Sequence, residues 1–202
     1  MKSIKKILIS FIFSSTAVFS ADWPTWGGND TRNMVSLETG LDLDFNPGEM
    51  NDDESVDMST TENVKWVAKL GSQAYGNVTI ANGYVFAGTN NESPRDSGKK
   101  GDRGVVMCFD EKTGKLSWQL VIPKLGAGKV SDWEYIGVCS SPAIEGNRVY
   151  VVTNKCEVVC LDLKGFSNGN DGPYMEEANY VKPMGTGDVL NEEIDADILW
   201  MY

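Results

Sequence analysis

Few side chains in this sequence could carry covalent or metal chemistry. It contains four cysteines, Cys108, Cys139, Cys156 and Cys160, and no histidine. Without histidine the chain has no Ser-His-Asp triad, no Cys-His pair, no histidine metal site and no Cys-x-x-Cys-His haem attachment. The thiols and a few aromatic and hydroxyl side chains around Cys139 are therefore the remaining candidates.

Two of the cysteines could form a disulfide bond in an oxidising compartment. Cys139 begins a predicted strand, and Cys156 follows the hairpin turn at the same end of that strand pair, so we predict a Cys139–Cys156 bond. The alternative is that Cys139 is a free thiol facing a ligand. Cys108 and Cys160 are expected to be reduced packing residues. This layout does not favour a zinc site built from all four.

Two further stretches could face a ligand. Candidate contact residues are Trp133 and Tyr135, in a loop that starts at Lys129, and the run Cys139, Ser140 and Ser141. Gap-filling by the two aromatic side chains is the alternative, and we favour it.

Nine carboxylates between residues 38 and 62 predict a solvated linker. The alternative is a calcium site, because calcium binds clustered carboxylates. Their spacing matches no calcium loop, so no metal ligand is assigned.

Charge and the N-terminus predict an exported protein. The net charge of −11 disfavours nucleic acid and anionic lipid as partners. Residues 1–20 have the pattern of a signal peptide, in which three lysines precede the 13-residue apolar run Ile7–Phe19. That run is shorter than the roughly 20 residues that span a bilayer. We expect a periplasmic or extracellular mature protein without a membrane span.

Short strands and turns must position these candidates. The clearest pattern for such a turn and the strand after it runs from Cys108 to Trp118. From Cys108 the residues are Cys-Phe-Asp-Glu-Lys-Thr-Gly-Lys-Leu-Ser-Trp. Asp110 can accept hydrogen bonds within its own turn, which Thr113 and Gly114 close, and glycine supplies the positive φ. This spacing resembles the tryptophan-docking motif of quinoprotein-type (PQQ-like) β-propellers, with Cys108 in place of the usual alanine. In that family the small residue and the tryptophan wedge neighbouring blades together.

The resemblance extends to the start of the mature chain and implies an all-β fold. Trp23 and Trp26 lie in Trp-Pro-Thr-Trp-Gly-Gly, which resembles the opening of exported propellers of this family. We interpret this opening as a strap whose indoles fill gaps against the propeller. The fold it implies is a β-propeller with four-stranded antiparallel blades.

An internal repeat supports blades of this kind. Ile80/Ile144, Val85/Val149 and Phe86/Tyr150 are each 64 residues apart, whereas Cys108/Cys160 and Asp110/Asp162 are 52 apart. The change of offset places a 12-residue insertion at 91–102. Trp66, Trp118 and Trp200 then belong to the last strands of three successive units. The basic residues around the first insertion are expected to form a solvated tip: Arg95, Lys99, Lys100 and Arg103.

The predicted organisation has three parts. These are the signal peptide (1–20), an N-terminal strap and acidic linker (21–62), and a partial propeller (63–202) with blades near 66–118 and 119–202 and an insertion at 164–197. Because a propeller takes four to eight blades, two blades predict the N-terminal fragment of a longer protein.

The resemblance implies two functions. In the first, preferred one, the protein is a binding or interaction scaffold that recognises a protein partner or small ligand at the channel face and needs no cofactor. In the alternative it is part of a PQQ- and calcium-dependent quinoprotein alcohol dehydrogenase. Such enzymes hold PQQ with a disulfide of adjacent cysteines, an Arg, a Trp and a calcium shell that includes an Asp base. No adjacent cysteines occur here, and no catalytic residue is assigned.

Overall fold

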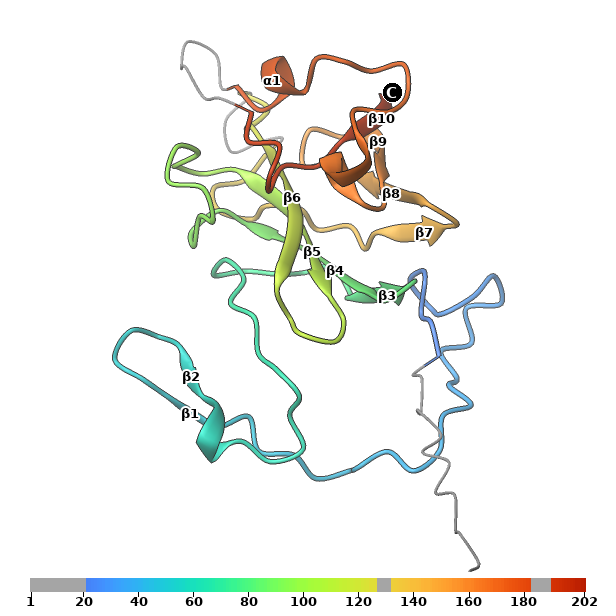
Figure 1. The fold of residues 1–202 in the computed structure, drawn as a ribbon, viewed down its shortest axis with the longest axis vertical. Coiled ribbons are helices and arrows are strands. Elements are labelled where there is room, and N and C mark those ends of the chain that lie inside the picture. The colour runs from blue at the N-terminus through green and yellow to red at the C-terminus, as the bar shows by residue number, and fades with distance from the viewer. Residues whose placement is uncertain (1–20, 127–131, 183–189) are drawn as a thin grey trace, which may run out of the picture.

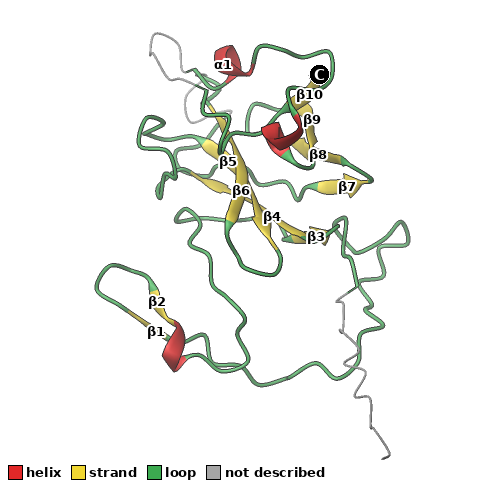
Figure 2. Ribbon diagram, viewed as in Figure 1, coloured by secondary structure: helices red, strands yellow, loops and turns green. Residues whose placement is uncertain are grey.

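The computed structural model describes residues 21–126, 132–182 and 190–202, which form two four-stranded antiparallel sheets and little helix (Figures 1 and 2). The first sheet has the order β3 (Thr79–Ala81), β4 (Tyr84–Asn90), β5 (Gly104–Asp110) and β6 (Leu116–Ile122). The second has the order β7 (Ala143–Glu145), β8 (Arg148–Val152), β9 (Val158–Asp162) and β10 (Ile198–Met201). The mostly antiparallel β fold predicted from the sequence is thereby confirmed. The predicted signal peptide lies outside the described residues, and among those described no helix has the length and hydropathy to cross a membrane.

Hairpin turns connect the first two strands of each sheet. Between β3 and β4, Asn82 and Gly83 both have positive φ, at 55° and 82°. Two successive positive φ values define the tight turn whose twist matches paired strands, and Asn-Gly is its preferred sequence. In the second sheet Gly146 supplies the positive φ, at 56°, between Glu145 and Arg148.

The register of the two sheets repeats the same three-residue arrangement. In the first sheet Phe86 is paired with Cys108, Cys108 is paired with Trp118, and the Phe86 and Trp118 rings are 6.0 Å apart at 50°. In the second sheet the corresponding residues are Tyr150, Cys160 and Trp200, with ring centroids 6.0 Å apart at 49°. The two sheets are therefore structural repeats of one unit.

Trp118 lies in the apolar core that the two sheets share. It is 1 % exposed and belongs to the same cluster as Phe86 and Leu120 of the first sheet and Val149 and Leu161 of the second. Its Nε1 donates a hydrogen bond to the carbonyl oxygen of Leu163, just after β9, at 2.9 Å. One indole therefore connects the last strand of one unit to a turn of the next.

Trp66 makes the equivalent contact with the first unit. Its Nε1 donates to the carbonyl oxygen of Glu111 at 2.8 Å, and its ring packs on Gly114, where an added Cβ would lie 2.5 Å from the indole. Gly114 has φ +69°, and Asp110 accepts hydrogen bonds from the backbone nitrogen (2.8 Å) and hydroxyl (2.7 Å) of Thr113. The turn thus has the hydrogen bonds expected from the sequence. Because Gly114 has no side chain, the Trp66 indole can pack directly on its backbone.

The N-terminal segment crosses the first strands of both sheets. Trp23 exchanges two backbone hydrogen bonds with Ile80 of β3, at 2.7 and 3.0 Å, and the carbonyl oxygen of Pro24 accepts one from Ile144 of β7 at 2.8 Å. Trp23 is half-buried, whereas Trp26 is 47 % exposed and has the Arg32 guanidinium 5.9 Å from its ring. The predicted strap is therefore a backbone bridge between the sheets, and Trp26 does not fill a gap in them.

The linker between the strap and the first sheet runs away from the two sheets (Figure 1). It holds a small hairpin, β1 (Glu49–Met50) and β2 (Val56–Asp57), and the 3-10 helix η1 (Met58–Thr60). Residues 64–70 then alternate half-buried and exposed side chains, as a strand with one buried face does. They join no sheet among the described residues, although the sequence predicts a last strand around Trp66.

The second insertion covers the edge of the first sheet. It includes the 3-10 helix η3 (Gly165–Asn168) and the helix α1 (Glu177–Tyr180). Further on, the backbone of Gln119 in β6 donates to Ile194 (2.7 Å) and accepts from Ala196 (2.8 Å). Because unpaired edge strands invite association with other chains, this pairing protects β6.

The prediction of a solvated tip on the first insertion was wrong for two of its four basic residues. Lys99 is 1 % exposed, and its Nζ lies 2.6 Å from Asp96 and 2.7 Å from Asp195 of the second insertion. Arg103 is 5 % exposed and donates to the carbonyl oxygen of Val181 at 3.0 Å. Burial of charged groups requires such partners. These two cations therefore connect the insertions.

A buried carboxylate in the second insertion predicts a pH-dependent stability. Asp197 is fully buried, accepts one hydrogen bond from the backbone of Asp171 (2.9 Å), and lies near the carboxylates of Glu177 and Asp162. Burial, followed by these negative neighbours, raises the pKa of Asp197 to about 6. The folded state therefore holds this proton more tightly than the unfolded state, so stability should fall as the pH rises from about 4 through 6.

We expect Asp197→Asn to increase the free energy of unfolding by about 1–2 kcal/mol at pH 7.5 and to change it little at pH 4, where the native carboxyl is already protonated. Urea unfolding at the two pH values measures both effects, with exposed Asp30→Asn as the control. An equal effect of Asp197→Asn at pH 4 and pH 7.5 would contradict this assignment.

Candidate functional site

A cavity of about 360 Å³ lies beside the segment that leads from the first sheet to the second. Its walls come from that segment and from the end of β8 with the turn that follows it. The lining residues are Asp132, Trp133, Ile136, Gly137, Cys139, Ser140, Val152, Thr153 and Asn154. Among the described residues, it is therefore a small site with one aromatic group, one thiol and several hydrogen-bonding groups.

Hydrogen bonds hold the segment that lines this cavity against both sheets. Val138 donates to the carbonyl oxygen of Thr89 at the end of β4, at 3.1 Å, and Ser140 Oγ donates to the carbonyl oxygen of Val152 at 2.6 Å. Gly137 has φ +74°, and a Cβ at this position would lie 2.3 Å from the Thr89 carbonyl oxygen. Glycine is required here because the backbone approaches β4 closely.

Three of the five predicted ligand-facing residues line the cavity, namely Trp133, Cys139 and Ser140. The other two do not. Ser141 accepts a hydrogen bond at its hydroxyl from the backbone of Asn77 at 2.8 Å. Tyr135 donates its backbone N–H to Asp102 at 2.9 Å, so it contributes to the fold of the loop. Lys129, which starts the predicted loop, lies outside the described residues.

Asp132 and Asn154 form the polar wall of the cavity. The predicted ligand-facing loop contains Asp132, which was not chosen as a contact residue, whereas Asn154 was missed. Asp132 is 8 % exposed and accepts hydrogen bonds from Lys124 Nζ (2.6 Å), the Leu125 backbone (2.9 Å) and Asn154 Nδ2 (2.9 Å). The repeat offered a signal for Asn154, because its partner Asn90, 64 residues earlier, also braces this segment through the Tyr135 carbonyl oxygen at 2.6 Å.

The predicted disulfide is not formed in the structure, where all four cysteines are free thiols. Cys156 lies in the turn after β8 with φ 63°, its side chain is exposed, and it is not among the residues that line the cavity of Cys139. Cys108 and Cys160 are fully buried. Burial raises the pKa of both of these thiols, as expected for inert packing cysteines.

Cys139 is an exposed thiol without the environment of a nucleophile. Partial burial, followed by the negative charge of Asp132, raises its pKa, and the opposing effect of Lys124 is smaller. A reactive cysteine needs a lowered pKa or an adjacent base. The cavity can therefore contact a ligand through this sulfur but does not activate it.

The cavity also does not fit PQQ and calcium. Asp132 is the one carboxylate among the described lining residues, and its oxygens are already used by Lys124, Leu125 and Asn154. Within residues 21–126, 132–182 and 190–202, no three cysteine or carboxylate side chains are placed to hold a metal ion.

The sequence matches no protein-family model and no curated protein.

Proposed function

We propose that this chain is part of an exported β-propeller of the PQQ-like repeat type that acts as a binding scaffold. The observation that carries the proposal is a repeated contact, in which the indole of one unit donates a hydrogen bond to the backbone of the next unit. The donor–acceptor pairs Trp66–Glu111 and Trp118–Leu163 are offset by 52 residues, and both span 45 residues of chain. Repeats that contact only their neighbours and stack through one recurrent contact are characteristic of propellers.

In this proposal the binding site is the cavity of Trp133, Cys139 and Ser140. The segment that forms it connects the last strand of one unit to the first strand of the next, and such loops surround the central axis of a propeller. Trp133 is 59 % exposed and offers a large apolar surface with a polar edge, which is the kind of side chain enriched at binding sites. A protein partner or a small ligand at the channel face would contact it.

Binding is favoured over catalysis by the state of the groups in the cavity. The Cys139 thiol has a raised pKa, and Asp132 is occupied by a lysine and two nitrogen donors. A general base needs a free carboxylate or amine at the reacting proton. The alternative, a PQQ-dependent dehydrogenase, would require a calcium shell and an Asp base from residues outside those described.

Photo-crosslinking tests the binding site in the native exported protein. p-Benzoylphenylalanine, an aromatic residue of similar size, replaces Trp133, and in a matched variant it replaces the exposed Trp26 of the strap. We expect irradiated cells to give one discrete adduct, identified by mass spectrometry, at position 133 and none at position 26.

No adduct at position 133, or the same adducts at both positions, would contradict the proposed site. Purified native protein is also incubated with PQQ, calcium, a primary alcohol and an artificial electron acceptor. PQQ-dependent reduction of the acceptor would favour the dehydrogenase over the scaffold.

A further inference from the structure

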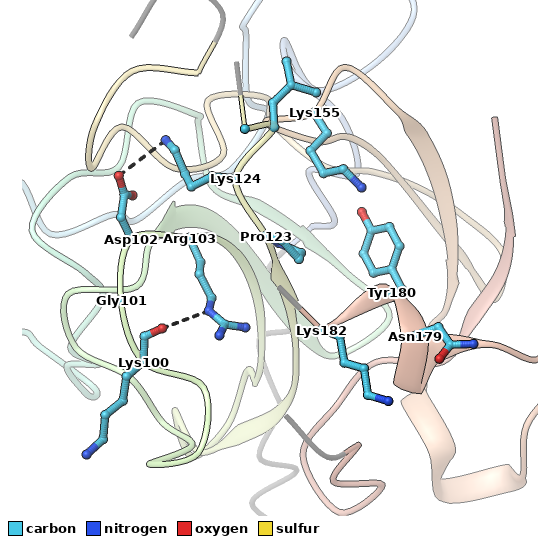
Figure 3. A pocket seen from close by; sticks show the side chains of 12 residues that line it. Lys100, Gly101, Asp102, Arg103, Pro123, Lys124, Lys155, Asn179, Tyr180 and Lys182 are labelled. Atoms are coloured by element: carbon cyan, nitrogen blue, oxygen red, sulfur yellow. Dashed lines mark hydrogen bonds and ion pairs between the residues drawn. The ribbon is translucent and has the colours of Figure 1, made fainter. Parts of the chain in front are cut away.

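A second and larger cavity, of about 580 Å³, lies where the two insertions meet. Its walls come from the end of the first insertion, the segment after β6, the turn after β8, and the end of helix α1 with Lys182 beyond it. Figure 3 shows side chains from these four segments surrounding one space. The volume is within the range of roughly 300–1,000 Å³ that small-molecule sites occupy.

The charge of this cavity is opposite to that of the chain. Five basic side chains and one acidic side chain, Asp102, line it among the described residues, whereas the whole sequence carries a net charge of −11. The basic side chains are Lys100, Arg103, Lys124, Lys155 and Lys182. Lys124 is ion-paired with Asp132 at 2.6 Å and with Asp102 at 3.6 Å, and the other basic side chains come from three separate segments around the space. An anion bound there would interact favourably with these cations.

The cations differ in how they are held, which gives the site both fixed and adjustable groups. Arg103 is 5 % exposed, and the carbonyl oxygens of Lys100 (3.0 Å) and Val181 (3.0 Å) fix its guanidinium. Lys155 pairs with Glu157 at 2.8 Å. Lys100 and Lys182 are exposed and make no ion pair with any other described residue. Flexible ammonium groups of this kind can move onto a bound anion at little structural cost.

Tyr180 supplies a rigid apolar surface beside these charges. It is 7 % exposed, its hydroxyl donates to Glu157 at 2.8 Å, and Lys155 Nζ lies 4.8 Å from its ring centre. Pro123 and Leu125 add apolar atoms on the opposing segment. The cavity therefore offers a place for carbon atoms as well as for charge, and is larger than a single inorganic ion needs.

We propose that this cavity binds a small anionic molecule that carries at least two carboxylate or phosphate groups. Guanidinium and ammonium groups are the side chains that recognise both of these anions. A small ligand is favoured over a macromolecule because the negative charge of the rest of the chain repels an extended polyanion, whereas a compact anion interacts mainly with the cavity. The proposal is independent of the blade interpretation.

Calorimetric titration of the purified exported protein tests the site, with citrate and pyrophosphate as the multivalent probes. We expect saturable binding of one equivalent of at least one of them, weakened by added sodium chloride because salt screens the charges. Lys182→Glu and Lys100→Glu should each weaken this binding on the order of tenfold. Both lysines are exposed, so the variants should fold, and circular dichroism checks this.

The matched control is Lys65→Glu, the same charge reversal at an exposed lysine that does not line the cavity. It should leave citrate and pyrophosphate binding within about twofold of the native protein. Absence of binding by both probes, or equal weakening by all three variants, would overturn the proposal. Binding of hexaglutamate without binding of either small anion would also overturn it, in favour of an acidic protein segment as the ligand.

Discussion

Trp118→Ala should lower the free energy of unfolding of the native protein by about 3–5 kcal/mol. The side chain is 1 % exposed, packs on Phe86 and contacts residues of both sheets, so its removal leaves a cavity in the core that joins the two units. Its loss also leaves the carbonyl oxygen of Leu163 without the indole donor. Urea unfolding followed by far-UV circular dichroism measures the change.

Two further variants separate packing from hydrogen bonding. Trp118→Phe retains a large aromatic side chain but not the Nε1 donor, so we expect a smaller loss of about 1–3 kcal/mol. Trp26→Ala, at a 47 % exposed position in the strap, should cost less than about 1 kcal/mol. A loss below about 1 kcal/mol for Trp118→Ala would mean that this indole does not hold the two units together.

Local chemistry explains why much of the fold was predictable. The Asn82-Gly83 turn and the Asp110–Gly114 turn depend on positive φ values and short hydrogen bonds that a few neighbouring residues encode. The repeat added long-range information, because Cys108 and Cys160, which the 52-residue offset matches, occupy equivalent places in β5 and β9, each opposite a tryptophan.

Contacts between distant loops were not predictable in this way. Lys99 and Asp195 are 96 residues apart, and a lysine on a loop has no local signal that distinguishes burial from solvation. For the candidate site, the sequence indicated Trp133, Cys139 and Ser140 by residue type, but not Asn154, whose side chain lies in the cavity wall because it donates to Asp132 from a different segment. The predicted Cys139–Cys156 bond rested on a shared strand end alone, and both thiols are free in the structure.

Lys99→Met should destabilise the protein by about 3–5 kcal/mol at pH 7.5, because it leaves the buried carboxylate of Asp195 without its cation. Asp195 is 2 % exposed, and its Oδ1 has no hydrogen-bond partner among the described residues. Asp96, the second partner of Lys99, is better able to gain water because its side chain is 18 % exposed. Lys100→Met, one residue further on at an exposed position, should change stability by less than about 0.5 kcal/mol.

The pH dependence of the Lys99→Met effect tests whether a charge, and not a packing defect, causes it. Burial raises the pKa of Asp195 even in the native protein, and loss of the lysine should raise it further. The folded variant then takes up a proton at a higher pH than the unfolded chain does. The loss of stability in Lys99→Met should therefore be largest above the folded-state pKa of Asp195 and should shrink as the pH falls toward 4.

A double variant provides a second test. Lys99→Met combined with Asp195→Asn should recover most of the lost stability at pH 7.5, because it removes the unpaired charge. A deficit that is the same at both pH values, and that Asp195→Asn leaves unchanged, would assign Lys99 a packing role alone.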